Sequence, residues 1–243
     1  MKVLTGIVGA AMVLAGASAQ ADQAGSIVVG AGWYRLSPQE KSEPLRITSP
    51  SAIAGEVPNT GSSVGNANTL GLTVEYFITN QIAVEAVFGI PPRYHLQGAK
   101  ALEPVGELGS AKQYSPSVLL RYHFGEPSQR LRPFVGVGVS RVWYGNVTLT
   151  DRFQGVLSSR YTGGATSAGR TEADIDSKFV PVFNIGAGYK ITERWGVGVS
   201  MSYLPLRTTI NLKTTLPTGA VIESETKTKL NPIVTVVGVT YSF

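Results

Sequence analysis

Hydrophobic residues alternate with small or weakly polar residues in segments of about ten residues along most of this chain. In the clearest segment, from Trp195 to Pro205, one side is apolar and aromatic, and the other side carries no charge. A period of two is typical of a strand with two different faces. A strand of a soluble β-sandwich carries polar residues on its solvent face. The uncharged second face therefore favours the narrow interior of a small barrel.

Seven further segments show the same alternation, and together they predict eight strands. The predicted strands cover residues 27–33, 70–78, 82–89, 118–124, 135–143, 179–189, 195–205 and 233–243.

The connections between these strands are alternately long and short. Short connections lie near residues 79–81, 125–130 and 191–194, and long ones cover roughly 37–68, 91–114, 145–177 and 210–228. In an outer-membrane barrel, both termini and the short turns face the periplasm, and the long loops face outward. A soluble all-β sandwich has no reason to separate its loop lengths in this way. The spacing predicts an eight-stranded antiparallel transmembrane β-barrel with short periplasmic turns and long extracellular loops.

The first residues have the features of a secretory signal peptide. Lys2 precedes an apolar stretch from Val3 to Gly16, and small residues follow, with cleavage expected after Ala19 or Ala21. The apolar stretch is shorter than a spanning helix requires, which is about 20 residues. We therefore assign residues 1–21 to the signal peptide and residues 22–243 to the barrel domain. Export by the secretory pathway to the outer membrane of a Gram-negative cell is the expected location.

Composition and charge agree with a strand-spanning membrane protein. Hydrophobic residues make up 43% of the chain and charged residues only 15%, against about 25% in soluble proteins. The net charge of +5 is scattered and forms no basic block, so no nucleic-acid partner is expected. We expect the partners of the outer surface to be outer-membrane lipid and lipopolysaccharide. There is no cysteine, and no cofactor or metal site is expected.

Aromatic residues gather at the ends of the predicted strands, as at membrane interfaces. The last strand ends in Tyr241 and Phe243. This ending resembles the carboxy-terminal signal that the barrel-assembly machinery of outer membranes recognises. Arg141 shares its face with apolar residues, where a charge at mid-bilayer costs about 2–4 kcal/mol. Either Arg141 lies at the outer rim, which we favour, or a β-bulge shifts the alternation there.

Several strand sequences resemble those of the OmpW family, and the resemblance extends over all eight strands. The segments that carry it are Gly71-Leu72-Thr73-Val74-Glu75-Tyr76-Phe77, Leu120-Arg121-Tyr122-His123-Phe124, Arg132-Pro133-Phe134-Val135-Gly136-Val137-Gly138-Val139 and Gly186-Ala187-Gly188-Tyr189-Lys190-Ile191. The resemblance implies an eight-stranded outer-membrane barrel with a narrow hydrophobic interior, linked to the passage of small hydrophobic molecules.

The inward positions of the predicted strands agree in part with this implication. Aliphatic residues predicted to line the lumen and contact a small hydrophobic ligand are Val87, Leu119, Val142, Val180, Val182, Leu204, Val234 and Val236. An eight-stranded barrel has room only for side chains or one small ligand. A polar plug is expected nearer the periplasm, formed by Glu75, Glu85, Arg121 and His123, under a compartment open to the outside; a purely structural network is the alternative.

A ligand above such a plug has to leave sideways into the bilayer. Proline lacks the amide that a strand ladder needs. Pro91, Pro92 and Pro205 lie where predicted strands approach the long loops, so we consider a lateral opening there. The alternative interpretation of these prolines is simple strand termination.

An enzyme is not expected. The only histidines are His95 and His123, and neither has a serine beside it. Neither a G-x-S-x-G nor an H-E-x-x-H motif occurs. Gly-x-Gly pairs lie inside predicted strands and are interpreted as spacing in the lumen. The leading functional hypothesis is passive passage of small hydrophobic molecules. The alternative is a non-conducting barrel whose long loops act in adhesion or as a phage or colicin receptor.

Overall fold

Eight strands close into an antiparallel barrel, in agreement with the predicted fold class. The computed structural model describes residues 22–39, 41–161 and 169–243, so the predicted signal peptide lies outside the described residues. The ring follows the chain order and closes where β1 pairs with β17. Its strands are β1 (Ile27–Ser37), β6 (Ala67–Phe77), β7 (Ile82–Gly89), β10 (Ser117–His123), β11 (Leu131–Leu149), β13 (Lys178–Lys190), β14 (Trp195–Tyr203) and β17 (Ile233–Ser242).

The two faces of the ring differ as the alternation predicts. On β6, Leu72 is 56% exposed whereas Glu75 and Phe77 are buried. Val137 on β11 is likewise 56% exposed, and the next inward residues are glycines or buried side chains. Apolar side chains that project outward around a closed ring require an apolar surrounding, which the hydrocarbon of a bilayer supplies.

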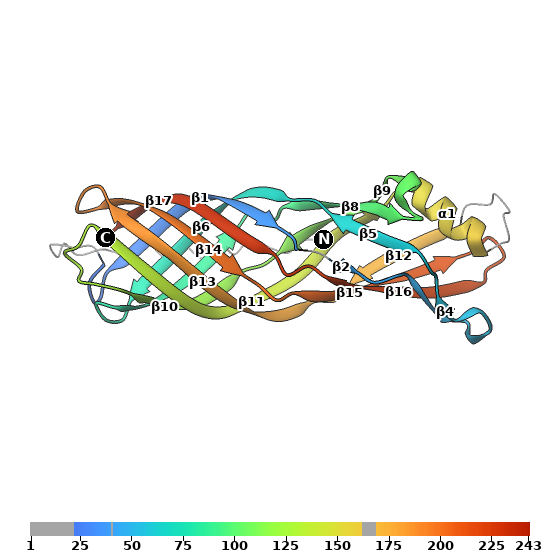
Figure 1. The fold of residues 1–243 in the computed structure, drawn as a ribbon, viewed down its shortest axis with the longest axis horizontal. Helices are drawn as coiled ribbons and strands as arrows, with labels where there is room; N and C mark the ends of the chain where they lie inside the picture. Colours follow the sequence, from blue (N-terminus) through green and yellow to red (C-terminus); the bar gives the residue numbers. More distant parts are fainter. Residues whose placement is uncertain (1–21, 40, 162–168) are drawn as a thin grey trace, which may run out of the picture.

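The long connections are largely regular, which differs from the predicted loops. They prolong the barrel as an extension at the end away from the carboxyl terminus (Figure 1). One side pairs β5, β8, β9 and the outer part of β11, and the other pairs β12, β15, β16, β3 and β4, with β2 against β16. The elements are β2 (Lys41–Ser42), β3 (Arg46–Ser49), η1 (Ser51–Ile53), β4 (Gly55–Glu56), β5 (Thr60–Val64), β8 (Arg93–Lys100), η2 (Glu103–Val105), β9 (Glu107–Tyr114), α1 (Asp151–Tyr161), β12 (Arg170–Ile175), β15 (Arg207–Thr215) and β16 (Val221–Lys229).

The polarity of these strands explains why they were predicted as loops. In β15 and β16, Arg207 pairs with Lys229 and Lys213 with Glu223. Such pairs place charged side chains on one face, and Leu212 and Ile222 are buried on the other. This is the pattern of a strand with one face in water. Lipid surrounds the ring, and water surrounds the extension.

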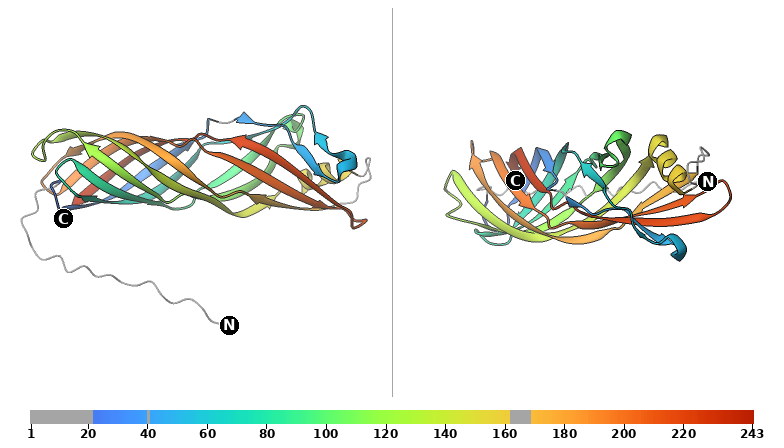
Figure 2. Two further views of the ribbon diagram at one scale, coloured as in Figure 1. Left: turned by 90° about the horizontal axis from the view of Figure 1, so that it is seen from below. Right: turned by 45° about the vertical axis from the view of Figure 1, so that its right-hand side comes forward.

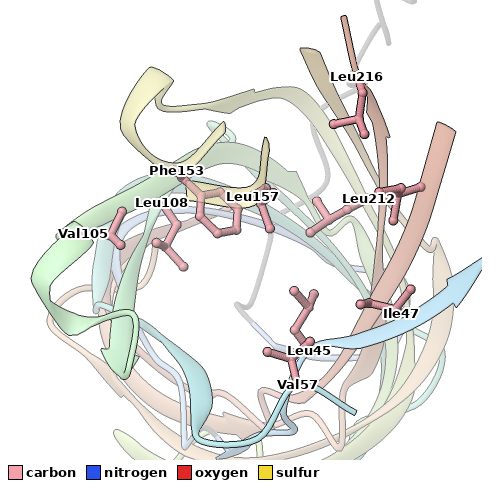
Figure 3. Packing of buried hydrophobic residues seen from close by; sticks show 10 residues of the cluster. Leu45, Ile47, Val57, Val105, Leu108, Phe153, Leu157, Leu212 and Leu216 are labelled. Carbon is pink, nitrogen blue, oxygen red and sulfur yellow. The ribbon is translucent and has the colours of Figure 1, made fainter. Parts of the chain in front are cut away.

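A hydrophobic cluster occupies the outer end of the extension, and we call it the outer cluster. Helix α1 contributes Phe153 and Leu157, which point toward Leu108 of β9 (Figure 3). Its buried members are Leu45, Ile47, Val57, Val105, Leu108, Phe153, Leu157, Leu212, Leu216 and Ile222. No helix within 22–39, 41–161 and 169–243 is long and apolar enough to cross a membrane.

The ring and the extension form one elongated body (Figure 2). Strand β11 runs through both, since it pairs with β13 from Leu131 to Val142 and then with β9 from Trp143 to Leu149. The start of β1 lies at the same end of the barrel as the carboxyl terminus, because the Phe243 amide donates to the carbonyl of Ile27. Both described ends of the chain thus lie at the end of the short turns.

Candidate functional site: the barrel lumen

Four ionisable side chains meet near the short-turn end of the lumen, as predicted. The Arg121 guanidinium lies 2.6 Å from the Glu85 carboxylate and 3.6 Å from the Glu75 carboxylate. His123 Nε2 lies 2.8 Å from Glu75 Oε1. All four residues are buried. Glu75 and Glu85 are directly opposite in the β6–β7 ladder, so the cation between them offsets their mutual repulsion. We call these four residues the charged network.

Two further residues, Asn184 and Ser202, extend the charged network and were not among the predicted site residues. Arg121 Nε donates to Asn184 Oδ1 over 3.1 Å, and Asn184 Nδ2 donates to Ser202 Oγ over 2.8 Å. The guanidinium of Arg121 lies 4.3 Å from the centre of the Phe134 ring, which adds a cation–π contact. The inward phase of Asn184 was visible in the sequence, but its partner depends on the register of β11 against β13.

A second polar layer closes the end of the barrel below the network. Arg132 is 2% exposed, and its guanidinium donates to the carbonyl oxygens of Asp22 and Asn80. The Asp22 carboxylate lies 3.2 Å from Lys190 Nζ. A cavity of about 150 Å³ is lined by both layers and extends past them, along β1, β14 and β17, to Leu119, Val234 and Val236. An apolar molecule that moved toward the short turns would therefore pass charged side chains of both layers.

Glycines in the strands give the lumen side chains their space. A Cβ on Gly186 would lie 2.5 Å from Cζ of Phe134, and one on Gly71 would lie 2.5 Å from Cε2 of Tyr34. Neither position therefore accepts a side chain without movement of a ring. For Gly186, which belongs to one of the Gly-x-Gly pairs, the backbone oxygen of Val199 lies equally close, so the glycine also admits the neighbouring strand.

An apolar layer fills the lumen above the charged network, and we call it the lumen cluster. Its buried members are Leu119, Val142, Val180, Val182, Leu204, Leu206 and Leu230, with Val64, Val87, Tyr144 and Val234 packed against it. Val236 packs beside it against Tyr34 and Leu36. All eight aliphatic residues predicted for the lumen thus face the interior. Contact with a ligand remains a prediction for each of them.

A cavity of about 270 Å³ connects the lumen cluster with the wall, and we call it the seam cavity. Its inner side includes Leu119, Val182 and Leu204, and its outer side lies along the seam between β7 and β10. The wall residues are Phe88, Gly89, Ile90, Pro91, Pro92, Tyr114, Ser115, Pro116 and Ser117. The structure therefore brings Pro91 and Pro92 to a cavity in the wall, together with Pro116, which sequence analysis did not select.

The backbone of the seam is open beside this cavity. Pairing of β7 with β10 ends at Val87 and Ser117, and the next hydrogen bond joins the Gln113 amide to the Pro92 carbonyl. Within the described chain, no backbone hydrogen bond joins residues 88–91 to residues 114–116. Pro91 and Pro116 have no amide hydrogen to offer there.

Pro205 lies away from the seam cavity. It follows β14, where the Leu204 amide donates to the Pro232 carbonyl over 3.2 Å and the Leu206 amide to the Leu204 carbonyl over 2.7 Å. Both flanking leucines are buried in the lumen cluster. Pro205 therefore lies at a strand end whose neighbours remain bonded.

Arg141 keeps the outward phase of its strand. The register of β11 against β13 is continuous from Leu131 to Val142, so the alternative of a bulge at this position is wrong. The guanidinium lies 5.5 Å from the centre of the Trp143 ring and 5.8 Å from that of Phe179. The β10–β11 ladder ends one residue earlier, at Ser140, which places Arg141 at the outer rim of the ring.

The carboxy-terminal aromatic residues lie on the outside of the ring. The rings of Tyr241 and Phe243 are 4.8 Å apart, and the ring of Trp195 lies 5.0 Å from that of Tyr241. They form an aromatic surface at the short-turn end. Recognition of Tyr241 and Phe243 by the barrel-assembly machinery remains a prediction.

Comparison with known proteins gives consistent matches over the whole barrel. The model of the OmpW family matches residues 23–243. The outer membrane protein AlkL of Ectopseudomonas oleovorans is 32% identical, over 78% of this chain and 72% of its own. Outer membrane protein W of Vibrio cholerae is 28% identical, over 95% of this chain and 94% of its own. The crystal structure of the outer membrane protein OprG from Pseudomonas aeruginosa superposes with a TM-score of 0.76 at 20% identity, covering 92% of this chain and 98% of OprG.

Proposed function

This chain belongs to the OmpW family and is an outer-membrane β-barrel, and on that premise we propose that it lets small hydrophobic molecules cross the outer membrane passively. The proposed route enters from the extension, passes the lumen cluster and leaves sideways through the seam cavity into the bilayer. No catalytic step and no cofactor take part in it.

The observation that carries this proposal is the composition of the seam cavity. One cavity has Leu119, Val182 and Leu204 of the lumen on one side and the unpaired backbone of the β7–β10 seam on the other. A hydrophobic molecule in contact with the lumen cluster is therefore next to a part of the wall that no strand ladder closes. The aliphatic side chains on the inner side of this cavity offer an apolar surface to such a molecule.

The charged network supports lateral release. Beneath the lumen cluster, Arg121 forms ion pairs with Glu75 and Glu85, and Arg132 lies buried below them. Transfer of an apolar molecule through paired charges is unfavourable, because the displaced charges lose their partners in a medium of low polarity. The bilayer beside the seam offers an apolar medium instead.

Two partner assignments belong to the same proposal. Arg141, stacked between Trp143 and Phe179 at the outer rim, has the position and charge to bind phosphate groups of lipopolysaccharide. Tyr241 and Phe243 are exposed in part on the last strand and accessible to the barrel-assembly machinery during insertion.

Uptake of a labelled alkane into vesicles that contain the purified protein tests the route. The double variant Leu119→Asp with Val182→Asp places two carboxylates in the lumen cluster, and we expect its uptake to fall about tenfold or more, since each buried charge opposes an apolar ligand. The matched control is Leu119→Met with Val182→Ile, which keeps the surface apolar and should retain uptake.

Both variants must first be shown to form the barrel by their resistance to unfolding in detergent. If the folded double aspartate variant takes up the alkane as fast as the wild type, the lumen is not the route and the proposal is wrong.

A further inference from the structure

The charged residues that follow the lipid face of the ring at its outer rim are cations. On β11, for example, the outward residues Val135, Val137 and Val139 are exposed and apolar, and the next outward residue is Arg141. Traced from the ring toward the extension, six strands reach a cation as their first outward charge: Arg35 on β1, Arg93 beyond β7, Lys112 beyond β10, Arg141 on β11, Arg207 beyond β14 and Lys229 beyond β17. We call these residues the cationic belt.

The belt holds like charges in directly opposite positions. Arg93 lies opposite Lys112 in the β8–β9 ladder, and Arg207 lies opposite Lys229 in the β15–β16 ladder. Both pairs project outward, because their neighbours along the strands are buried, namely Tyr94, Ala111, Thr208 and Thr228. Like charges in directly opposite positions destabilise a sheet. A bound anion would remove this repulsion.

Further out in the extension, charges in opposite positions have opposite signs. Lys213 lies opposite Glu223, and Arg46 lies opposite both Glu56 and Glu225. The uncompensated cations are therefore a property of the boundary between the ring and the extension, and not of the extension in general.

Three cations of the belt lie around two aromatic rings at the seam cavity. Tyr114 and Trp143, which both line that cavity, are opposite in the β9–β11 ladder, and their rings are stacked 5.2 Å apart. Lys112 lies two residues from Tyr114 on the side of the extension, with Arg93 opposite it, and Arg141 lies two residues from Trp143 on the side of the ring. We call Arg93, Lys112 and Arg141 the seam cations.

Within the described part of the chain, no seam cation takes part in an ion pair. The acidic residues of the adjoining segments already have partners. Glu107 of β9 lies 2.8 Å from His95, and Asp176, just before β13, lies 3.4 Å from Lys178. The seam cations therefore have charge available for an external anion.

We propose that the seam cations bind the phosphate groups of one phosphorylated glycolipid of the outer leaflet, of the lipid A type. Guanidinium and ammonium groups are the side chains that bind phosphate in proteins. The seam cations are spread over the neighbouring strands β8, β9 and β11, a width of roughly 10 Å at the spacing of paired strands. This width suits a lipid with more than one phosphate on its head group.

Apolar side chains beside the seam cations provide for the acyl chains of such a lipid. Phe88, Ile90 and Phe179 are 54%, 63% and 73% exposed, and Phe88 and Ile90 belong to the wall of the seam cavity. The inference rests on the proposed function, because it specifies the lipid at the outer rim and places it beside the proposed exit. A hydrophobic molecule that leaves the seam would enter among the acyl chains of the bound lipid.

Native mass spectrometry of the full mature chain in detergent, titrated with bis-phosphorylated lipid A, tests this inference. The triple variant Arg93→Gln, Lys112→Gln and Arg141→Gln should weaken binding of the first lipid A molecule about tenfold or more, because charged donors to its phosphates are lost. The substitutions lie on the outer surface and remove a like-charge pair, so the barrel should still form, and urea unfolding checks this. Lys112→Arg with Arg141→Lys keeps the charges and should keep the binding.

The triple variant Arg170→Gln, Lys213→Gln and Lys227→Gln is the matched control. It removes the same charge from the extension, but each of these cations already faces a carboxylate, on Glu172, Glu223 and Glu225 respectively. We expect it to change lipid A binding less than about twofold.

Two further probes identify the source of the phosphate. Dephosphorylated lipid A and phosphatidylglycerol should each bind the wild type at least about tenfold more weakly than bis-phosphorylated lipid A. Equal weakening by the two triple variants, or equally tight binding of either probe, would overturn the inference. The titration measures lipid binding and not transport, so unchanged alkane uptake in the lumen variants would refute the proposed route and leave this result intact.

Discussion

At the scale of single residues, the lumen combines strongly paired charges with unpaired hydroxyls. Arg121 contacts two carboxylates, an amide and an aromatic ring, which leaves none of its main binding directions empty. Tyr144 and Thr228 lie further out and have no partner. The paired charges hold the strands together near the short-turn end of the barrel, whereas the two hydroxyls are buried without a hydrogen bond among the described residues.

Arg121→Met should be strongly destabilising, because it leaves Glu75 and Glu85 buried without a cation. Loss of one partner from a buried ion pair costs about 3–5 kcal/mol. Urea unfolding in vesicles measures the change in the free energy of unfolding.

The triple variant Arg121→Met with Glu75→Gln and Glu85→Gln is the matched control, since it removes all three charges. We expect it to recover most of the lost stability. Equal destabilisation of the single and triple variants would mean that the Arg121 side chain stabilises the barrel by packing, and that its ion pairs contribute little to the free energy of unfolding.

At the scale of elements, the seam between β7 and β10 differs from the other seams of the ring. The β1–β17 ladder is continuous from Val28 to Ser37. The β7–β10 ladder is short, and the segments beyond it contain Pro91, Pro92 and Pro116. These prolines explain why the strands separate there, and the seam cavity lies behind the separated segment.

A reversible bridge across the seam should slow lateral release. The chain has no cysteine, so Gly89→Cys with Ser115→Cys introduces the only two thiols, one on each side of the gap. Joining them with a short bifunctional methanethiosulfonate should reduce alkane uptake into vesicles several-fold, and a reductant should restore it.

The corresponding pair Ala31→Cys with Val239→Cys crosses the intact β1–β17 ladder, where the two residues are already opposite each other. A bridge there should leave uptake unchanged. Equal loss of uptake from both bridges, or none from the first, would contradict release through the β7–β10 seam.

At the scale of the whole molecule, the ring and the extension form one continuous body, but lipid surrounds the ring and water surrounds the extension. Outward residues of the ring, such as Val137, are apolar, whereas the strands of the extension pair charged residues on their outer face. Helix α1 and the outer cluster complete the extension, whose interior is apolar at that end.

Arginine substitutions measure the boundary between the two surroundings. Val137→Arg places a charge on the lipid face of the ring and should lower the free energy of unfolding by about 2–4 kcal/mol. Val221→Arg, on the partly exposed outer face of β16, should change it by less than about 0.5 kcal/mol. Urea unfolding in vesicles compares the two, and equal effects would show that lipid does not distinguish the ring from the extension.

The eight strands of the ring could be predicted because their alternation is imposed by two unlike surroundings. Alternate residues of each strand face lipid and the narrow lumen, so hydrophobicity along the sequence alternates with a period of two. This alternation predicts that Glu75, Leu119 and Val182 point inward. The strands of the extension carry polar and charged residues on the face that contacts water. Loops have a similar composition, so β15 and β16 were predicted as part of a loop.

The order of the sequence determined which side chains face inward, because alternation along a strand depends only on local geometry. Which inward residues meet depends on the register between strands distant in the chain. Only the tertiary structure therefore joined Arg121 to Asn184, brought Pro116 beside Pro91 and left Pro205 at a bonded strand end.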